Sequence, residues 1–345
     1  MKLLLISSSV SSLQSGKSGG VGQTLRYLVN ELIHSYSISI LASNDSTSDL
    51  GVDIIKCNGD YSSPAQHTDL CVYSSKSLIH SYTSYLSNYS HHYDYIVNFS
   101  FDLPLFELQY SNLFHYVSMS CPSKSFLDLF RKCYLKSPDH FSFLTESQFQ
   151  SFCIDYSTPF IIGGGLPINS FTFNELPTKG LIWAGRISAE KNIELALKLS
   201  NYSNLPLTIC GFIEDHDYWN RLQEKYNMDL IQYAGFLKGD TYHNELASSK
   251  VLLHTANWIE AYGKVIIESL LCGTPAIAHN YGGPSNLIKN KYTGFLVSED
   301  FHSWVNAINS IDTISRKYCR TYSVNHFSMT GFLERFFNWL QVHSK

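Results

Sequence analysis

Short apolar runs alternate with amphipathic stretches along almost the whole chain, and this alternation restricts the fold more than any other feature. The first examples are the run KLLLIS at 2–7, the helix-type stretch GQTLRYLVNELIHSY at 22–36 and the run SISILAS at 37–43. Buried strands that are separated by helices indicate a parallel sheet with crossover connections. We therefore expect an α/β protein.

The alternation is interrupted between residues 161 and 180. This stretch, IIGGGLPINSFTFNELPTKG, is rich in Gly, Pro and Asn, as interdomain connections are. A chain of 345 residues is also longer than one hydrophobic core usually supports. We therefore expect two doubly wound, Rossmann-like domains, formed by residues 1–165 and 179–325 and joined by a linker at 166–178.

Charge and hydropathy argue against several classes of protein. With 25 Lys and Arg against 29 Asp and Glu, the net charge of -4 argues against nucleic acid as the main partner. No apolar stretch approaches the roughly 20 residues of a membrane span, and the run at 3–6 is shorter than that of a secretory signal. The eight cysteines include no C-x-x-C pair. We expect a cytoplasmic protein with reduced thiols and no integral membrane association.

The segment EAYGKVIIES places Glu260 before a helix and Glu268 within it. The helix is expected to begin near Gly263 and to stop at Gly273. Its first backbone N–H groups can receive an anion such as a diphosphate, and carboxylates beside it can accept hydrogen bonds from sugar hydroxyls. Alternatively, Glu268 faces solvent and pairs with Lys264, while the helix dipole favours Glu260.

Two further patterns occur in the same half of the chain. PAIAHNYGGPSNLI, at 275–288, indicates a strand, a glycine loop and a helix, and therefore a second phosphate-type loop. In GRISAEKN, Arg186 follows a strand and Lys191 comes five residues later, so both cations can point to one diphosphate. Alternatively, these cations lie in a solvated loop and pair with Glu190 and Glu194.

In this order and spacing, GRISAEKN, EAYGKVIIES and CGTPAIAHNYGGP resemble the donor half of retaining GT-B glycosyltransferases of family four. The resemblance implies that Arg186 and Lys191 hold the donor diphosphate, that Glu260 reads the transferred sugar and that Glu268 bonds the nucleotide ribose. It also implies that the amphipathic helix at 326–343 packs back on the first domain. Other residues expected to line the donor site are Gly19, Gly20, Gly211, Ala261, Tyr262, Gly263, Lys264 and Val265. The family usually has proline where Ala261 stands.

The glycine loop SGKSGGVGQ near the amino terminus has three interpretations. A P-loop would need glycine at Ser11, and a dinucleotide fingerprint would need glycine at Leu25, so both patterns are incomplete. By the resemblance, Gly19 and Gly20 let the backbone approach the donor phosphate and the acceptor. A flexible turn is the alternative.

The acceptor side departs from the family pattern. A family histidine commonly ends a later strand, but Ser118, Met119 and Ser120 stand there in YVSMSCPS. Asp102 is a candidate to orient the acceptor hydroxyl, or it caps the following turn. The acceptor-binding candidates are Asn98, Phe101, Ser118 and Ser120, with a place in the core as the alternative for the aromatic ring.

A finer similarity is to the cyanobacterial UDP-glucose:tetrahydrobiopterin glucosyltransferases, through DYIVNFSFDLP, DHDYWNRLQEKY and the segment after Asn257. It implies UDP-glucose as donor and a reduced pterin as acceptor. We expect no metal and no cofactor, because fixed cations already neutralise the diphosphate. A GT-B nucleotide-sugar epimerase and an inactive sugar-nucleotide-binding protein are the alternative functions.

Overall fold

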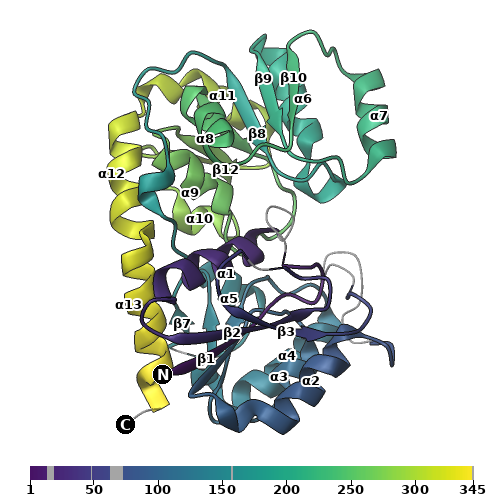
Figure 1. The fold of residues 1–345 in the computed structure, drawn as a ribbon. Coiled ribbons are helices and arrows are strands. Elements are labelled where there is room, and N and C mark those ends of the chain that lie inside the picture. The colour runs from purple at the N-terminus through teal and green to yellow at the C-terminus, as the bar shows by residue number, and fades with distance from the viewer. Residues whose placement is uncertain (14–18, 48, 63–72, 157, 344–345) are drawn as a thin grey trace. The chain divides into compact units, whose positions relative to one another are not determined.

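The computed structural model describes residues 1–13, 19–47, 49–62, 73–156 and 158–343. The chain divides into two compact units, each built on a parallel sheet (Figure 1). Unit 1 consists of Met1–Gly165 and Met329–Lys345, and unit 2 of Leu166–Ser328.

Unit 1 contains a seven-stranded sheet with the order β3-β2-β1-β4-β5-β6-β7. Its strands are β1 (Lys2–Ile6), β2 (Ser37–Ser43), β3 (Asp53–Cys57), β4 (Tyr95–Asn98), β5 (Leu113–Val117), β6 (Phe141–Phe143) and β7 (Phe160–Ile161). Its helices are α1 (Gly19–Leu32), α2 (Leu78–Tyr89), α3 (Leu103–Phe106), α4 (Lys124–Lys136), α5 (Glu146–Ser151) and α13 (Met329–Leu340).

Unit 2 contains a six-stranded sheet with the order β10-β9-β8-β11-β12-β13. Its strands are β8 (Leu181–Ala184), β9 (Leu207–Cys210), β10 (Ile231–Gly235), β11 (Val251–His254), β12 (Ala276–His279) and β13 (Gly294–Val297). Its helices are α6 (Ile193–Ser203), α7 (His216–Lys225), α8 (Gly239–Ser248), α9 (Lys264–Leu271), α10 (Pro284–Leu287), α11 (Phe301–Asn309) and α12 (Arg316–Phe327).

Apolar strands and amphipathic helices form the core as the sequence pattern predicts. Leu3 to Ile6 of β1 are fully buried, because both faces of a parallel sheet are covered. In α4 the buried positions Phe126, Phe130 and Tyr134 follow one helical stripe. The Phe130 ring packs 4.5 Å from that of Phe152, within an aromatic cluster of unit 1.

The helix expected at 326–343 corresponds to α13, and a further helix, α12, precedes it. α12 ends at Phe327 in unit 2, and α13 begins at Met329 in unit 1. In α13, Trp339 is buried and donates a hydrogen bond from Nε1 to the Asp139 carbonyl oxygen at 3.0 Å. Arg335 donates from Nε to the Ile162 carbonyl oxygen at 2.8 Å. These contacts attach α13 to the segments next to β6 and β7 in unit 1.

The strand order of each sheet reverses once, between β1 and β4 in unit 1 and between β8 and β11 in unit 2. Ligands of doubly wound sheets bind outside the carboxyl ends of the strands at such a reversal. In unit 2 this location belongs to the segments that follow β8 and β11, which contain Arg186, Lys191 and Glu260.

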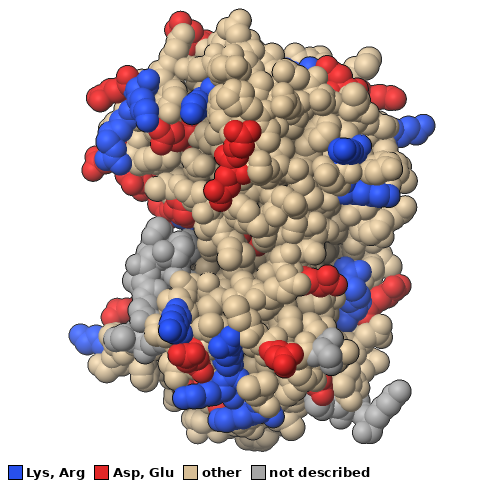
Figure 2. Space-filling model, turned by 180° about the vertical axis from the view of Figure 1, so that it is seen from behind, with Lys and Arg blue, Asp and Glu red and all other residues tan. Residues whose placement is uncertain are grey.

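The surface carries both signs of charge. On the face shown in Figure 2, basic and acidic side chains are interspersed among other residues. Among the described residues, no helix combines the length and hydropathy needed to cross a membrane. Cys71 lies outside the described residues, and the seven other cysteines are free thiols.

Candidate functional site

Three side chains meet between the ends of β8 and β11 in unit 2. The Lys191 ammonium forms an ion pair with Oε1 of Glu260, and the Trp258 indole donates a hydrogen bond to the same oxygen at 2.9 Å. The ammonium also lies 5.1 Å from the centre of the Trp258 ring, within cation–π range. The side chains of Lys191 and Glu260 are 20% and 12% exposed, so water screens this pair little.

Thr255 connects the segment after β11 with the segment after β8. Its hydroxyl donates to the carbonyl oxygens of Lys191 and Asn192, at 3.1 and 2.7 Å, and accepts a hydrogen bond from Nε1 of Trp183 in β8. The backbone N–H of Asn257 donates to the Glu190 carbonyl oxygen at 3.0 Å. These hydrogen bonds to the main chain around Lys191 therefore fix the position of this residue.

The Glu260 carboxylate stays ionised although it is largely buried. Burial raises its pKa, but the Lys191 ammonium, His254 and the Trp258 indole outweigh burial and lower the pKa to about 2. Burial also lowers the pKa of His254, at the end of β11, to about 4. At neutral pH Glu260 is therefore a carboxylate and His254 a neutral imidazole.

Arg186 is bound by acids of its own unit. Its guanidinium pairs with Glu190 at 3.0 Å and with Glu214. The predicted alternative for this loop is therefore correct for Glu190 and wrong for Glu194, which binds Lys225 and Tyr226 instead. A guanidinium has five N–H donors, so these two pairs do not exhaust its capacity.

Gly211, at the end of β9, lets two strand ends approach closely. It has a φ of +153°, and a Cβ atom at this position would lie 1.7 Å from the Gly185 carbonyl oxygen. Gly185 immediately precedes Arg186. Gly211 therefore contributes to the site by allowing the backbone geometry that places Arg186.

The helix α9 runs from Lys264 to Leu271, with Gly263 as its N-cap residue and a φ of +85° at Gly273, as predicted. Just before this helix, Ala261 is buried and Tyr262 is half-buried. Val265, in its first turn, is also half-buried.

Glu268 faces the interior, so the alternative of a solvent-facing side chain is wrong. It is 9% exposed, and its Oε2 accepts a hydrogen bond from the Tyr242 hydroxyl at 3.0 Å. Lys264, one turn earlier, is also enclosed: burial lowers its pKa to about 8, against the attraction of Glu268.

The second glycine loop has a packing role. A Cβ atom at Gly283 would lie 2.2 Å from the Tyr262 carbonyl oxygen, and one at Gly282 would lie 2.9 Å from the Glu260 carbonyl oxygen. The Gly283 N–H donates to that Glu260 oxygen at 2.7 Å. The helix that follows, α10, has only four residues. This loop therefore supports the backbone of Glu260, and its proposed contact with a phosphate stays a prediction.

Asp102 in unit 1 is enclosed by serine hydroxyls. Its Oδ2 accepts from Ser9 and Ser100, each at 2.6 Å, and its Oδ1 accepts from Ser62 at 3.2 Å. It is 1% exposed. Burial raises its pKa, and the serine hydrogen bonds oppose this. Asp102 occupies the N-cap position of α3, but its side chain makes no capping hydrogen bond, so the capping interpretation is wrong.

The aromatic acceptor candidate belongs to the core. Phe101 is buried and stacks on Phe126 with ring centres 4.8 Å apart, which leaves little of its ring for a ligand. Asn98 is fully buried, where its Nδ2 lies 3.2 Å from Nδ1 of His115. Burial lowers the pKa of His115 to about 3, as expected for a packed core histidine.

The remaining candidates of unit 1 lie just after β5 and at the start of α1. Ser118 is half-buried after β5, and Ser120 is buried with no hydrogen-bond partner for its hydroxyl among the described residues. Gly19, with a φ of +60°, and Gly20 are exposed at the start of α1, and a Cβ atom at either would meet open space. The preceding residues 14–18 lie outside the described residues.

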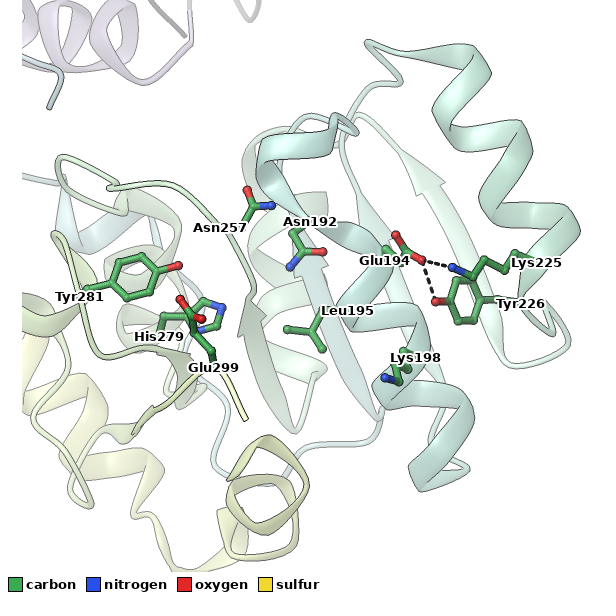
Figure 3. A pocket seen from close by; sticks show the side chains of 10 residues that line it. All are labelled: Asn192, Glu194, Leu195, Lys198, Lys225, Tyr226, Asn257, His279, Tyr281 and Glu299. Atoms are coloured by element: carbon green, nitrogen blue, oxygen red, sulfur yellow. Dashed lines mark hydrogen bonds and ion pairs between the residues drawn. The ribbon is translucent and has the colours of Figure 1, made fainter. Parts of the chain in front are cut away.

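A cavity of about 660 Å³ lies beside this site in unit 2 (Figure 3). Its lining comprises Asn192, Glu194, Leu195, Lys198, Lys225, Tyr226, Asn257, His279, Tyr281 and Glu299. None of the four side chains predicted to bind the donor lines it, although Asn192 is next to Lys191 in the chain. Within the described part of the chain, no three His, Cys, Asp or Glu side chains gather to hold a metal ion.

The fold of the whole chain is that of the GT-B glycosyltransferases. Anabaena HepE, solved in complex with UDP and glucose, matches with a TM-score of 0.76 at 15% identity, over 99% of both chains. Sucrose-phosphate synthase from Thermosynechococcus elongatus matches with a TM-score of 0.77 at 17% identity, also over 99% of both chains.

Sequence comparison then relates the second unit to a family of glycosyltransferases. Residues 172–323 match the family Glycosyl transferases group 1. The UDP-Gal:alpha-D-GlcNAc-diphosphoundecaprenol alpha-1,3-galactosyltransferase of Escherichia coli is 28% identical over 178 residues, which are 48% of this chain and 44% of that protein. The chain thus spans less than half the length of this relative. The match contains Arg186, Lys191, Glu260 and Glu268 within the family region.

Sequence reasoning missed Trp258, Tyr242 and Glu214. Trp258 lies two residues before Glu260 in the chain, and this closeness is the signal that the sequence offers for it. Tyr242 and Glu214 reach their partners from other elements, 26 and 28 residues away along the chain. No local pattern reports such contacts.

Proposed function

We propose that this chain is a retaining glycosyltransferase that moves a hexose, glucose from UDP-glucose, to a hydroxyl-bearing small molecule. The observation that supports this most is the placement of Lys191 and Glu260 at the strand reversal of unit 2, beside the start of α9. The match of residues 172–323 to Glycosyl transferases group 1 supports the same reaction class.

In the proposed complex, Arg186 and Lys191 bind the diphosphate of the donor. Both cations are held by carboxylates, so the phosphate oxygens take up their remaining N–H donors. Glu260 is ionised at neutral pH and accepts hydrogen bonds from sugar hydroxyls, while Glu268 accepts from the ribose. UDP is the proposed nucleotide because the similar HepE structure contains UDP and glucose.

In the transfer step, the bond between the anomeric carbon and the phosphate oxygen breaks while the acceptor oxygen bonds to the same face of that carbon. The two bonding electrons leave with UDP, and the acceptor proton passes to the departing phosphate. The Arg186 and Lys191 cations stabilise the developing negative charge. No carboxylate nucleophile is needed in this scheme. This agrees with the enclosure of Asp102 by serines.

The acceptor is proposed as a hydroxyl compound, and a reduced pterin is the candidate that the resemblance of DYIVNFSFDLP and DHDYWNRLQEKY implies. A nucleotide-sugar epimerase would need no second substrate, and a binding protein would release no UDP. These three functions predict different products from the same mixture.

The test incubates purified protein with UDP-glucose, first alone and then with acceptors that include tetrahydrobiopterin. Acceptor-dependent UDP release is the expected result, with an α-linked product by NMR. Lys191→Ala is expected to lose this release. Lys225→Ala removes another Lys–Glu pair of unit 2 and is expected to retain it.

Three outcomes contradict the proposal or a part of it. A rearranged sugar nucleotide in the mixture without acceptor would favour epimerisation. Tight UDP-glucose binding without UDP release across the acceptor panel would favour a binding protein. Equal release by the Lys191→Ala variant and the wild type would exclude the proposed role of this cation.

A further inference from the structure

We infer that Tyr242 is a positioning residue that orients Glu268 toward the ribose of the nucleotide. This inference rests on the proposed function, since it gives the ribose-binding carboxylate a fixed partner. Tyr242 lies in α8 and Glu268 in α9, and the two side chains meet inside unit 2.

The contact fixes one oxygen of the carboxylate. The Tyr242 hydroxyl donates to Oε2 of Glu268 at 3.0 Å. An ionised carboxylate only accepts hydrogen bonds, so the direction of this bond is set. Burial and the neighbouring Glu268 raise the pKa of Tyr242 well above its usual value, and the hydroxyl therefore keeps its proton.

A carboxylate with one fixed oxygen presents the other in a defined direction. Glutamate has a flexible side chain, and a ligand that must first order it loses affinity. A neighbouring donor that holds the side chain in advance removes this cost. Tyr242 thereby affects how strongly a ribose hydroxyl is recognised without itself contacting the nucleotide.

The Tyr242 hydroxyl is not needed to hold α8 in place. Thr274 donates from its hydroxyl to the Leu246 carbonyl oxygen at 2.6 Å, and the Cys272 thiol lies 3.5 Å from the His243 carbonyl oxygen. The His243 ring also packs against Phe171, with centres 4.2 Å apart. Tyr242→Phe therefore removes one hydrogen bond and leaves the packing of α8 intact.

The experiment measures calorimetric dissociation constants for UDP, 2′-deoxy-UDP and 3′-deoxy-UDP. In the wild type, loss of the recognised hydroxyl is expected to weaken binding about tenfold, as for hydrogen bonds to charged groups. Tyr242→Phe is expected to reduce this discrimination to about threefold or less, and Glu268→Gln to abolish most of it.

Tyr226→Phe is the matched control. Tyr226 also donates to a glutamate of unit 2, Glu194, at 2.9 Å, and its removal is expected to leave the tenfold discrimination unchanged. Thermal unfolding of all four proteins checks that each is folded.

The outcomes separate this inference from the proposed function. Tyr242→Phe could change the dissociation constants of UDP and both deoxy nucleotides by the same factor, or change none of them. If Glu268→Gln loses the discrimination between UDP and the deoxy nucleotides in the same experiment, the role of Tyr242 is wrong and the proposed function stands. If Glu268→Gln also discriminates normally, the ribose role of Glu268 and this inference both fail. If the wild type binds no UDP, the proposed function itself is wrong.

Discussion

Replacing Lys191 with methionine removes the cation beside Glu260 and keeps most of the side-chain volume. In the wild type, burial opposes ionisation of Glu260, but Lys191 and His254 outweigh it and lower the pKa from 4.5 to about 2. The difference of about 2.5 corresponds to about 3 kcal/mol, at 1.36 kcal/mol for each pKa unit. Without Lys191, the pKa of Glu260 is expected to rise toward its ordinary value of 4.5.

The sign of the pH dependence follows from the lowered pKa. A carboxyl group of this kind stabilises the fold above its unfolded-state pKa, and the contribution is lost as the pH falls through the folded-state pKa. At pH 7 Lys191→Met is therefore expected to lower the free energy of unfolding by up to about 3 kcal/mol. The difference from the wild type is expected to shrink between pH 4.5 and about 2.

The assay is urea unfolding of the wild type and the variant at a series of pH values, followed by tryptophan fluorescence. Lys225→Met is the control, because the Lys225 and Glu194 side chains are 62% and 35% exposed and such pairs stabilise little. If the difference in free energy of unfolding between the wild type and Lys191→Met stayed constant from pH 7 to pH 3, the electrostatic explanation would be refuted.

Four further predictions concern unit 2. Arg316→Ala is expected to lower the free energy of unfolding by about 3 kcal/mol, because it removes the buried guanidinium hydrogen bonds to Ser249, Ala247 and Thr274; thermal unfolding measures this. Gly211→Ala is expected to weaken UDP binding in calorimetry, since its Cβ atom would collide with the Gly185 carbonyl oxygen at 1.7 Å. Arg186→Ala is expected to reduce kcat/KM by the equivalent of about 2 to 4 kcal/mol in a UDP-release assay. Glu268→Gln is expected to raise the dissociation constant of the donor more than it lowers kcat, and single-turnover kinetics separate the two effects.

The fold could be predicted from the sequence because the spacing of apolar residues distinguishes buried strands from amphipathic helices. The boundaries of α9, marked by Gly263 and Gly273, follow from local backbone chemistry and agree with the structure. The GT-B fold predicted from three segments is likewise confirmed by the similar solved structures.

Contacts between elements that are far apart in the chain leave no local sequence pattern and could not be predicted. Gly282 and Gly283 suggest a phosphate loop in the sequence, and the sequence does not show that both glycines also pack closely against the backbone of Glu260 and Tyr262. Glu268 looks exposed by its position beside Lys264, yet α8 covers it through Tyr242. In each case, the partner lies on another segment.

A crystal structure of the chain with UDP tests the central claim most directly. The account predicts diphosphate oxygens within hydrogen-bond distance of Arg186 and Lys191, and ribose hydroxyls at the Glu268 carboxylate. UDP ordered elsewhere, for example in the cavity beside His279, with both cations still bound only to their glutamates, would contradict it.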